Sequence, residues 1–255
     1  MNAVDQGDVK YSIENGIATV EFHHPLSNSL PGKVLAKLAY TITELGTNDN
    51  ALVIIVRSAG ERAFCAGASF DELVAINDLE VGKVFFSGFA NVINACRKCP
   101  KLIIGRVQGK AVGGGVGLAS AFDYTVATKF ASVKLSELAV GIGPFVVGPA
   151  VERKIGVSAM SQLAIDATEW QTAEWAKNKG LYTEIFDTAE AMDEAISALA
   201  NKLCKSNPEA MRLLKQVFWE GTEHWDTLLA ERAAMSGQLV LSDFTKNAIN
   251  SFKKK

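Results

Sequence analysis

The sequence has no excess of either charge and no long apolar run. Its 255 residues include 26 Lys and Arg against 28 Asp and Glu, which gives a formal net charge of −2. A nucleic-acid-binding module would be expected to carry a basic excess, so that class is excluded, whereas a phosphorylated small ligand needs only a few local cations. No apolar run approaches the roughly 18–20 residues that span a bilayer, so no membrane partner is expected.

Cysteine and histidine are also scarce. The 4 cysteines are too few for a secreted disulfide scaffold. Cys96 and Cys99 have CxxC spacing, but the histidines show no spacing that would complete a zinc site, and the pair ends a helical pattern instead of opening one. We interpret both as ordinary buried or partly buried thiols and expect no metal. Residues 1–8 are polar and acidic, unlike a signal peptide, so a cytoplasmic location is expected.

Strand and helix patterns alternate through the first part of the chain. A hairpin is predicted around the two-residue turn Asn15-Gly16. Continuous apolar runs predict strands buried on both faces, and amphipathic stretches predict helices. The expected strands are 52–56, 102–107, 123–127 and a short one at 131–134, and the expected helices are 31–45, 69–76 and 81–97. This alternation predicts an α/β core.

The pattern is almost wholly helical from about Pro149 onward. These helices must bury their apolar stripes on the core or on another subunit. We therefore divide the chain into an α/β core at residues 1–195 and a helical C-terminal region at residues 196–255. The four tryptophans lie in helical patterns, where packing is the expected role.

Two turns rich in small residues each connect a buried strand to a helix. One is residues 61–70 and the other is Gly113-Gly114-Gly115. Small residues let a ligand approach the backbone closely, and a helix N-terminus offers unpaired N–H groups. Two such turns side by side would supply two donors to one oxygen, as an oxyanion hole requires. Phosphate binding or tight packing alone would use similar turns.

Three common site motifs are absent from the sequence. No dinucleotide fingerprint follows the first strand, and there is no phosphate-binding P-loop. A Ser/His/Asp hydrolase is excluded because the sequence has no G-x-S-x-G elbow. The two turns therefore remain the main chemical signal.

In combination, these features resemble the crotonase (enoyl-CoA hydratase/isomerase) family over nearly the whole chain. The order and spacing of the matching segments make the resemblance specific. Those segments are Ile17–Val20 with His24-Pro25, Ala63–Ala68, Gly109–Gly117, Gly141–Pro144 and Thr172–Leu181.

The resemblance implies a spiral of ββα units with a C-terminal helical region that forms trimers. It implies an acyl-CoA thioester as substrate, with coenzyme A as part of that substrate and no separate cofactor. The thioester oxygen would accept hydrogen bonds from the N–H groups of Ala68 and Gly114, and losing such a donor typically costs about 3–4 kcal/mol. Ala66, Gly67 and Gly113 would line the substrate path. A homotrimer or a dimer of trimers is the implied assembly.

The sequence departs from the family pattern at two positions. Hydratases of the family carry two glutamates, and the first of these positions is Gly117 here, which leaves room near the acyl group. The usual Arg or Lys before the first proline is His24, which puts that phosphate contact in doubt. Phe252 and Lys253 resemble the positions that close over the CoA nucleotide.

The second glutamate position of the family corresponds to Glu137. Its sequence neighbours are apolar, so desolvation is expected to raise its pKa and suit it to carrying a proton near neutrality. Phe145 stands where dienoyl-CoA isomerases and a dehalogenase of the family have an aspartate, and Glu137 stands where that dehalogenase has a tryptophan. Both of those activities are therefore disfavoured.

Three functions fit this pattern. The leading one is a lyase that reversibly hydrates a 2-enoyl-CoA, including branched substrates such as methylglutaconyl-CoA, with Glu137 as the single acid/base. The second is a Δ3,Δ2-enoyl-CoA isomerase that uses the same carboxylate. The third is an acyl-CoA-binding relative with weak catalysis, because one carboxylate is absent.

Overall fold

A computed structural model describes residues 6–252 of the chain. A six-stranded sheet runs through its centre in the order β1-β2-β4-β6-β8-β10. β1 and β2 form an antiparallel hairpin, and the later strands add in parallel. The strands are β1 (Asp8–Glu14), β2 (Ile17–His23), β4 (Val53–Ser58), β6 (Ile103–Val107), β8 (Tyr124–Thr128) and β10 (Glu184–Phe186).

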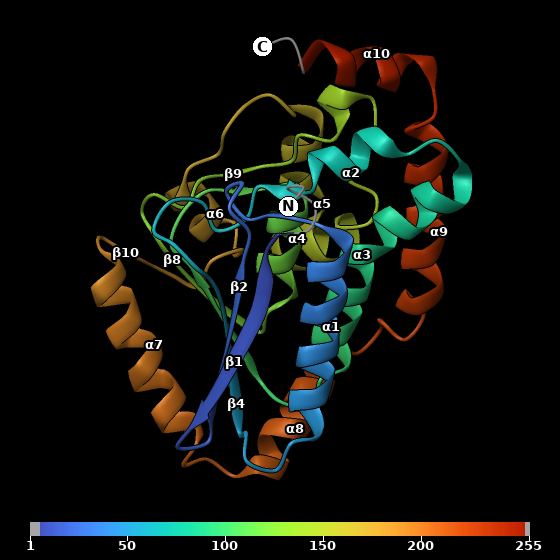
Figure 1. Cartoon of the computed structure of the whole chain (residues 1–255). Helices are drawn as coiled ribbons and strands as arrows, with labels where there is room; N and C mark the ends of the chain where they lie inside the picture. The colour runs from blue at the N-terminus through green and yellow to red at the C-terminus, as the bar shows by residue number, and fades with distance from the viewer. Residues whose placement is uncertain (1–5, 253–255) are drawn as a thin grey trace.

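Helices cover both faces of this sheet (Figure 1). α1 (Gly32–Thr47) and α3 (Leu79–Lys98) lie on one side, where their apolar residues join those of the strands in the largest core cluster. α7 (Ala189–Leu203) lies on the other side and packs Met192 and Ile196 against β4, β6 and β8. Burial on both faces explains the continuous apolar runs of β4 and β6. The predicted α/β core is confirmed.

Two short parallel ladders lie outside the main sheet. β3 (Ser29–Leu30) pairs with β5 (Gly67–Ala68), and β7 (Ala111–Val112) pairs with β9 (Val133–Lys134). An isolated bridge between Cys65 and Ala111 connects the two ladders. Loops far apart in the sequence are thereby fixed side by side.

The remaining helices follow the chain to its C-terminus. α2 (Phe70–Ala75) and α4 (Gly114–Ala121) follow the two short ladders. The later helices are α5 (Gly148–Ile165), α6 (Ala173–Asn178), α8 (Pro208–Phe218), α9 (Trp225–Leu239) and α10 (Asp243–Phe252). The almost wholly helical pattern expected from Pro149 onward is confirmed, with β10, a three-residue strand that pairs with β8, as the exception among the described residues. The boundary proposed between residues 195 and 196 falls inside α7.

A buried ion pair joins the sheet to the C-terminal region. Lys215 on α8 lies 2.8 Å from Asp123, which precedes β8, and both side chains are almost fully buried. Asp123 also accepts hydrogen bonds from the backbone N–H of Ile103 and from Trp219 Nε1. These contacts give Asp123 a structural role.

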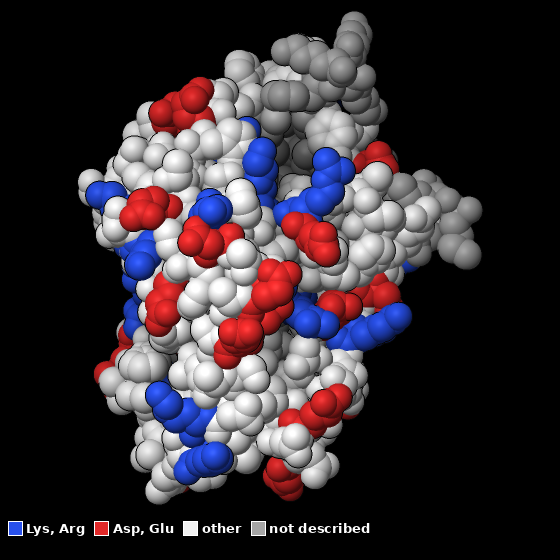
Figure 2. All heavy atoms as spheres, turned by 90° about the vertical axis from the view of Figure 1, so that its left-hand side faces the viewer, with Lys and Arg blue, Asp and Glu red and all other residues white. Residues whose placement is uncertain are grey.

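The described interior agrees with the interpretation of the CxxC pair as ordinary thiols. Cys96 and Cys99 are free and buried, and burial raises the pKa of both thiols. Within residues 6–252, no helix is long and apolar enough to cross a membrane, and no cluster of ligating side chains could hold a metal ion. Figure 2 shows acidic and basic side chains intermixed on the face that it presents. The cytoplasmic location stays a prediction.

Candidate active site

A cavity of about 460 Å³ lies where the two turns meet α2, α3 and the loop before α5. Its walls are mainly apolar, with a small number of polar side chains, as is usual for small-molecule sites. The predicted residues that line it are Ala66, Gly67, Ala68, Gly113, Gly114, Glu137 and Phe145. The structure therefore brings together seven positions that are spread over 80 residues of sequence.

Backbone pairing holds the two small-residue turns against each other. Val112 N–H donates to Cys65 O at 2.9 Å, directly before the Gly113-Gly114-Gly115 turn. A Cβ on Gly115 would lie 2.5 Å from Cys65 O, so a side chain here would force the two turns apart. A Cβ on Gly67 would lie 3.8 Å from Gly114 N, which places the 66–68 turn beside the start of α4.

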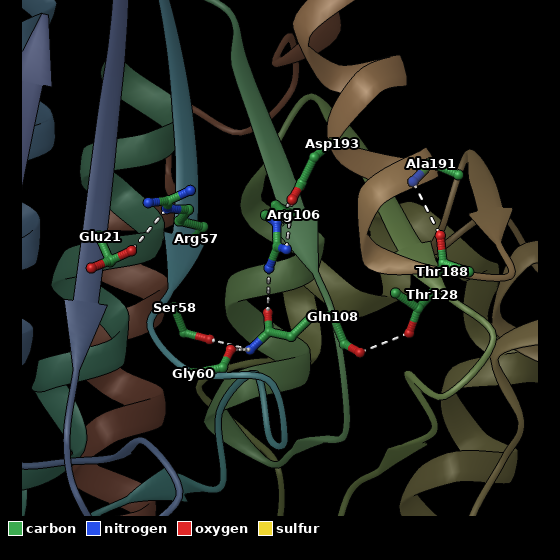
Figure 3. Close-up of polar contacts among 10 residues, drawn as sticks. All are labelled: Glu21, Arg57, Ser58, Gly60, Arg106, Gln108, Thr128, Thr188, Ala191 and Asp193. Atoms are coloured by element: carbon green, nitrogen blue, oxygen red, sulfur yellow. Dashed lines mark hydrogen bonds and ion pairs between the residues drawn. The ribbon is translucent and has the colours of Figure 1, made fainter.

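Gln108 anchors the loop that leads into the first turn (Figure 3). Its Nε2 donates to Ser58 Oγ at 2.9 Å and to Gly60 O at 3.1 Å, and its backbone O accepts from Thr128 Oγ1. Asn28 Nδ2 donates to Ala63 O at 3.0 Å. These contacts fix residues 59–63, so the turn that follows starts from a rigid base.

Both turns line the cavity, where their backbone N–H groups can serve as donors. Gly114 is the first residue of α4, where an N–H has no acceptor within the helix and the helix dipole is positive. Ala68 ends β5 and lines the same cavity. The Phe89 ring covers Gly114 so closely that a Cβ there would lie 2.3 Å from it. Apolar walls strengthen any hydrogen bond that these donors make to a developing negative charge.

Glu137 lies beside the glycine turn. A Cβ on Gly113 would be only 2.8 Å from Glu137 Oε1, and Gly113 has a φ of +53°, which favours glycine. The backbone O of Glu137 accepts from Ile142 N–H at 3.0 Å, and Thr245 on α10 donates to Gly141 O. The loop that carries Glu137 is thus held from its own backbone and from the C-terminal helix.

The surroundings of Glu137 shift its proton affinity. Although the residue is partly exposed, its carboxylate Oε2 is buried and has no hydrogen-bond partner among the described residues. Burial raises the pKa of Glu137 from 4.5 to about 7. The predicted desolvation is confirmed, and the carboxyl can both accept and return a proton near neutral pH.

The space expected beside Gly117 does not exist. A Cβ on Gly117 would lie 2.4 Å from Val147 Cγ1, and Val147 lines the cavity whereas Gly117 lies behind it. The expectation that Gly117 leaves room near the acyl group is wrong, because Val147 fills that room. Among the described residues that line the cavity, Glu137 is the only carboxylate.

The other predicted site residues lie in different places. The Phe145 ring covers Gly143 at the cavity wall. His24 is buried, accepts a hydrogen bond at Nδ1 from Leu26 N–H and does not line the cavity. For Phe252, only the backbone is described, at the end of α10, and Lys253 lies outside the described residues.

Sequence patterns missed part of the cavity wall. Lys134 and Ser236 line it from β9 and α9, and no motif singled them out. Trp170 also lines the cavity and is 39% exposed, so its expected role as a packing residue is wrong. Trp219 and Trp225 do pack, edge to face at 5.8 Å. The one signal in the sequence was that Lys134 and Ser136 lie within three residues of Glu137, the catalytic candidate.

A family model, similar sequences and similar solved structures all match enoyl-CoA hydratases or their relatives. The family model described as enoyl-CoA hydratase/isomerase matches residues 12–255. A short-chain-enoyl-CoA hydratase of Clostridium acetobutylicum is 29% identical over 245 residues, covering 95% of this chain and 93% of the relative. A human mitochondrial methylglutaconyl-CoA hydratase is 31% identical, covering 89% of this chain and 68% of the relative. The crystal structure of an enoyl-CoA hydratase from Bacillus halodurans, 19% identical, superimposes with a TM-score of 0.88 and covers 95% of this chain and 99% of its own.

Proposed function

Because this chain belongs to the enoyl-CoA hydratase/isomerase family, we propose that it reversibly hydrates a 2-enoyl-CoA with Glu137 as its single acid/base. The observation that carries the proposal is the position of the Glu137 carboxyl beside Gly113, next to the donors of the second turn, in an apolar cavity. The Ala68 and Gly114 N–H groups are assigned to the thioester oxygen. No separate cofactor takes part.

The reaction needs only these groups. The Glu137 carboxylate removes a proton from water as the water oxygen bonds to C3 of the substrate, and the C2–C3 π electrons move onto the thioester oxygen. Ala68 and Gly114 stabilise that enolate oxygen by hydrogen bonding. The protonated Glu137 then returns the proton to C2, which completes addition of water across the double bond. A carboxyl with a pKa of about 7 is matched to both steps.

A second activity is favoured by one observation. Val147 occupies the space into which the first glutamate of the family's hydratases would extend from the position of Gly117. A site with one proton carrier can move a proton between two carbons without adding water. The second candidate is therefore a Δ3,Δ2-enoyl-CoA isomerase that uses Glu137 and the same oxyanion hole. An acyl-CoA-binding relative with weak catalysis is the third.

A substrate panel separates the three activities. Straight-chain, branched and aryl enoyl-CoAs are incubated with the enzyme in ordinary and deuterated water, and the products are identified by mass spectrometry. Hydration adds the mass of one water to the substrate. Isomerisation incorporates deuterium without adding water, and a protein that only binds acyl-CoA leaves the substrate unchanged. A methylglutaconyl thioester belongs in the panel because a relative acts on it.

A pair of variants tests the assignment of Glu137. Glu137→Gln keeps the shape of the side chain but cannot take a proton, so turnover should fall by about 10²–10⁴-fold, with binding of coenzyme A unchanged. Glu169→Gln is the matched control, because Glu169 is an exposed carboxylate beside the cavity-lining residues Thr168 and Trp170. A fully active Glu137→Gln enzyme would show that another group moves the proton.

The assembly proposed for this enzyme is a homotrimer or a dimer of trimers. α8 leaves Leu213, Leu214, Val217 and Phe218 exposed in the single chain, and such a row favours burial against another subunit. Sedimentation equilibrium measures the mass directly, and a monomer at micromolar concentration would exclude both assemblies.

A further inference from the structure

The loop that carries Glu137 has little packing of its own. Glu137 is followed by the short 3₁₀ turn η2 (Leu138–Val140), none of whose residues is buried. Because Glu137 Oε2 has no hydrogen-bond partner among the described residues, no side chain ties this oxygen to the cavity wall. The backbone of residues 137–142 must therefore set the place of the carboxyl group.

One peptide group connects Glu137 to the C-terminal helix. The N–H of Ile142 donates to the backbone O of Glu137 at 3.0 Å. The C=O of the same peptide group belongs to Gly141, and it accepts a hydrogen bond from Thr245 Oγ1 on α10 at 3.0 Å. A peptide group is planar and rigid, so a contact that fixes its carbonyl end also fixes the N–H end that Glu137 binds.

The hydroxyl group of Thr245 is oriented by a neighbouring serine. Thr245 is fully buried. Ser242 Oγ donates to Thr245 Oγ1 at 3.1 Å and accepts from the Thr245 N–H at 3.3 Å. Because Ser242 supplies the proton of the contact between the two hydroxyls, the Thr245 proton is left for Gly141 O. The serine therefore directs the threonine toward the loop of Glu137.

The loop and α10 also fit closely against each other. Gly141 has a φ of +81°, which favours glycine, and a Cβ there would lie 2.6 Å from Thr245 Oγ1 and 2.6 Å from Phe244 Cδ1. Ile249 of α10 belongs to the same buried apolar cluster as Ile142. Apolar packing can therefore hold α10 in place without the Thr245 hydroxyl, and a variant that lacks only this hydroxyl tests its separate contribution.

We propose that Thr245 is a positioning residue for the reaction: its hydroxyl holds the peptide group between Gly141 and Ile142 and, through it, the Glu137 carboxyl in the cavity. The proposal rests on the proposed function, which assigns the proton transfers to Glu137. Thr245 does not line the cavity, so it acts through the loop and not on the substrate. Its loss should lower turnover and leave substrate binding nearly unchanged.

Steady-state hydration of crotonyl-CoA tests this separation of turnover from binding. Thr245→Val removes the hydroxyl but keeps the branched shape of the side chain. Its kcat should fall by about 10–100-fold, because a small displacement of a catalytic group disrupts proton transfer, with KM nearly unchanged. Thr245→Ser keeps the hydroxyl and should retain most of kcat.

The pH profile gives a readout that a merely structural residue would not move. Among the described charged side chains of α2, α3, α10 and β9, only Lys134 lines the cavity, and burial is the main cause of the raised pKa of Glu137. A loosened loop admits water to the carboxyl, and hydration lowers the pKa of a buried acid. In Thr245→Val the bend of kcat/KM against pH should therefore move from about 7 toward 4.5.

Thr222 provides a matched control for the lost hydrogen bond. It is also buried, its Oγ1 donates to Trp219 O at 2.6 Å, and it does not line the cavity. Thr222→Val should lower the midpoint of urea unfolding much as Thr245→Val does, but leave kcat and the pH profile unchanged.

A second variant keeps the test decisive if Thr245→Val does not fold. Ser242→Ala removes the donor to Thr245 Oγ1 and leaves the threonine in place. It should give a smaller fall in kcat with the same direction of shift in the pH profile. An unchanged kcat and an unmoved bend in a folded Ser242→Ala enzyme would then overturn the proposal.

The outcomes separate the positioning role from the proposed function. If Glu137→Gln is inactive while Thr245→Val keeps the kcat and the pH profile of the parent, the positioning role is overturned and the proposed function stands. If Thr245→Ser loses as much activity as Thr245→Val, the hydroxyl is not what holds Glu137, and the proposal is wrong. If the parent enzyme converts no enoyl-CoA of the panel, or Glu137→Gln is as active as the parent, the proposed function fails and the positioning role falls with it.

Discussion

A single carboxyl sets the expected pH dependence of catalysis. Hydration requires Glu137 as a carboxylate, and burial raises its pKa to about 7. We expect kcat/KM for hydration to rise about 10-fold per pH unit below this value and to level off above it. The measurement is the initial rate of loss of enoyl absorbance between pH 5 and 9 at constant ionic strength, and a profile without a bend near neutrality would contradict it.

The same carboxyl affects stability with a definite sign. In the unfolded chain Glu137 should titrate near its ordinary value of 4.5, whereas in the folded chain its pKa is about 7. The folded state therefore prefers the protonated form, and stability falls as pH rises from about 4.5 to about 7. Relative to the parent, Glu137→Gln should gain up to about 3 kcal/mol in free energy of unfolding across this interval. Urea titrations of both proteins at pH 5 and pH 8 measure the difference, and an unchanged gap would refute the burial argument.

At the residue scale, the local sequence predicts the protonation behaviour of a side chain better than it predicts which distant residues that side chain will contact. The raised pKa of Glu137 was foreseeable because its sequence neighbours are apolar. The contact between Gly117 and Val147 joins residues 30 positions apart, and nothing in either local pattern predicts it. The exposure of Trp170 depends on which side of the chain faces the cavity, which its helical neighbourhood did not reveal.

At the scale of elements, α4 and the loop before α5 fit together through one glycine. Gly117→Ala would place a Cβ 2.4 Å from Val147 Cγ1, so the two segments must move apart. Overpacking of this kind typically costs about 1–3 kcal/mol. We expect that loss in chemical denaturation, and partial recovery in Gly117→Ala with Val147→Ala.

A second glycine serves as the control for that pair. A Cβ on Gly148 would meet only Met160 Cε at 3.4 Å, which is an ordinary contact. Gly148→Ala should therefore change stability little. Equal losses at both positions would mean that the close approach of Val147 is not what disfavours a side chain at Gly117.

Gln108 connects the sheet to the first turn, so its loss should affect both stability and catalysis. Gln108→Leu removes the donor of Gly60 O and leaves the buried Ser58 Oγ without its partner, which should cost about 1–3 kcal/mol. Because residues 59–63 lead into the turn that carries Ala68, kcat should fall as well. Gln216→Leu, at an exposed position of α8, is the control. A variant that loses stability but keeps full kcat would show that the turn does not depend on this anchor.

The elements themselves differed in how well the sequence predicted them. β4 and β6 carry apolar runs, because both of their faces are covered, and the predicted bounds of β4, β6 and β8 agree with the structure to within two residues. β3, β5 and β10 have two or three residues each, which is too short for any periodicity to register. The two β3–β5 and β7–β9 ladders still decide the site, since they hold the turns together.

At the scale of the molecule, the C-terminal helices are joined to the sheet by charge as well as by apolar packing. α9 lies along α3 so closely that a Cβ on Gly82 would be 2.9 Å from Gly237 Cα. Thr245 on α10 reaches the loop that carries Glu137. The division of the chain into a core and a C-terminal region rests on the sequence pattern alone and stays a prediction. Because these contacts join the two regions, we expect them to unfold together.

The buried pair of Lys215 and Asp123 tests that cooperativity. Lys215→Met leaves the Asp123 carboxylate buried with only the Ile103 N–H and the Trp219 indole as donors. Breaking a buried pair in this way costs about 3–5 kcal/mol. Lys205→Met, at an exposed position, should cost almost nothing, and adding Asp123→Asn to Lys215→Met should recover part of the loss because no charge is then left unpaired. If the two regions form one cooperative unit, tryptophan fluorescence and far-UV circular dichroism report the same shifted midpoint in urea. Two separate transitions in Lys215→Met would show instead that α8 can leave the sheet while the core stays folded, and that the ion pair is what couples them.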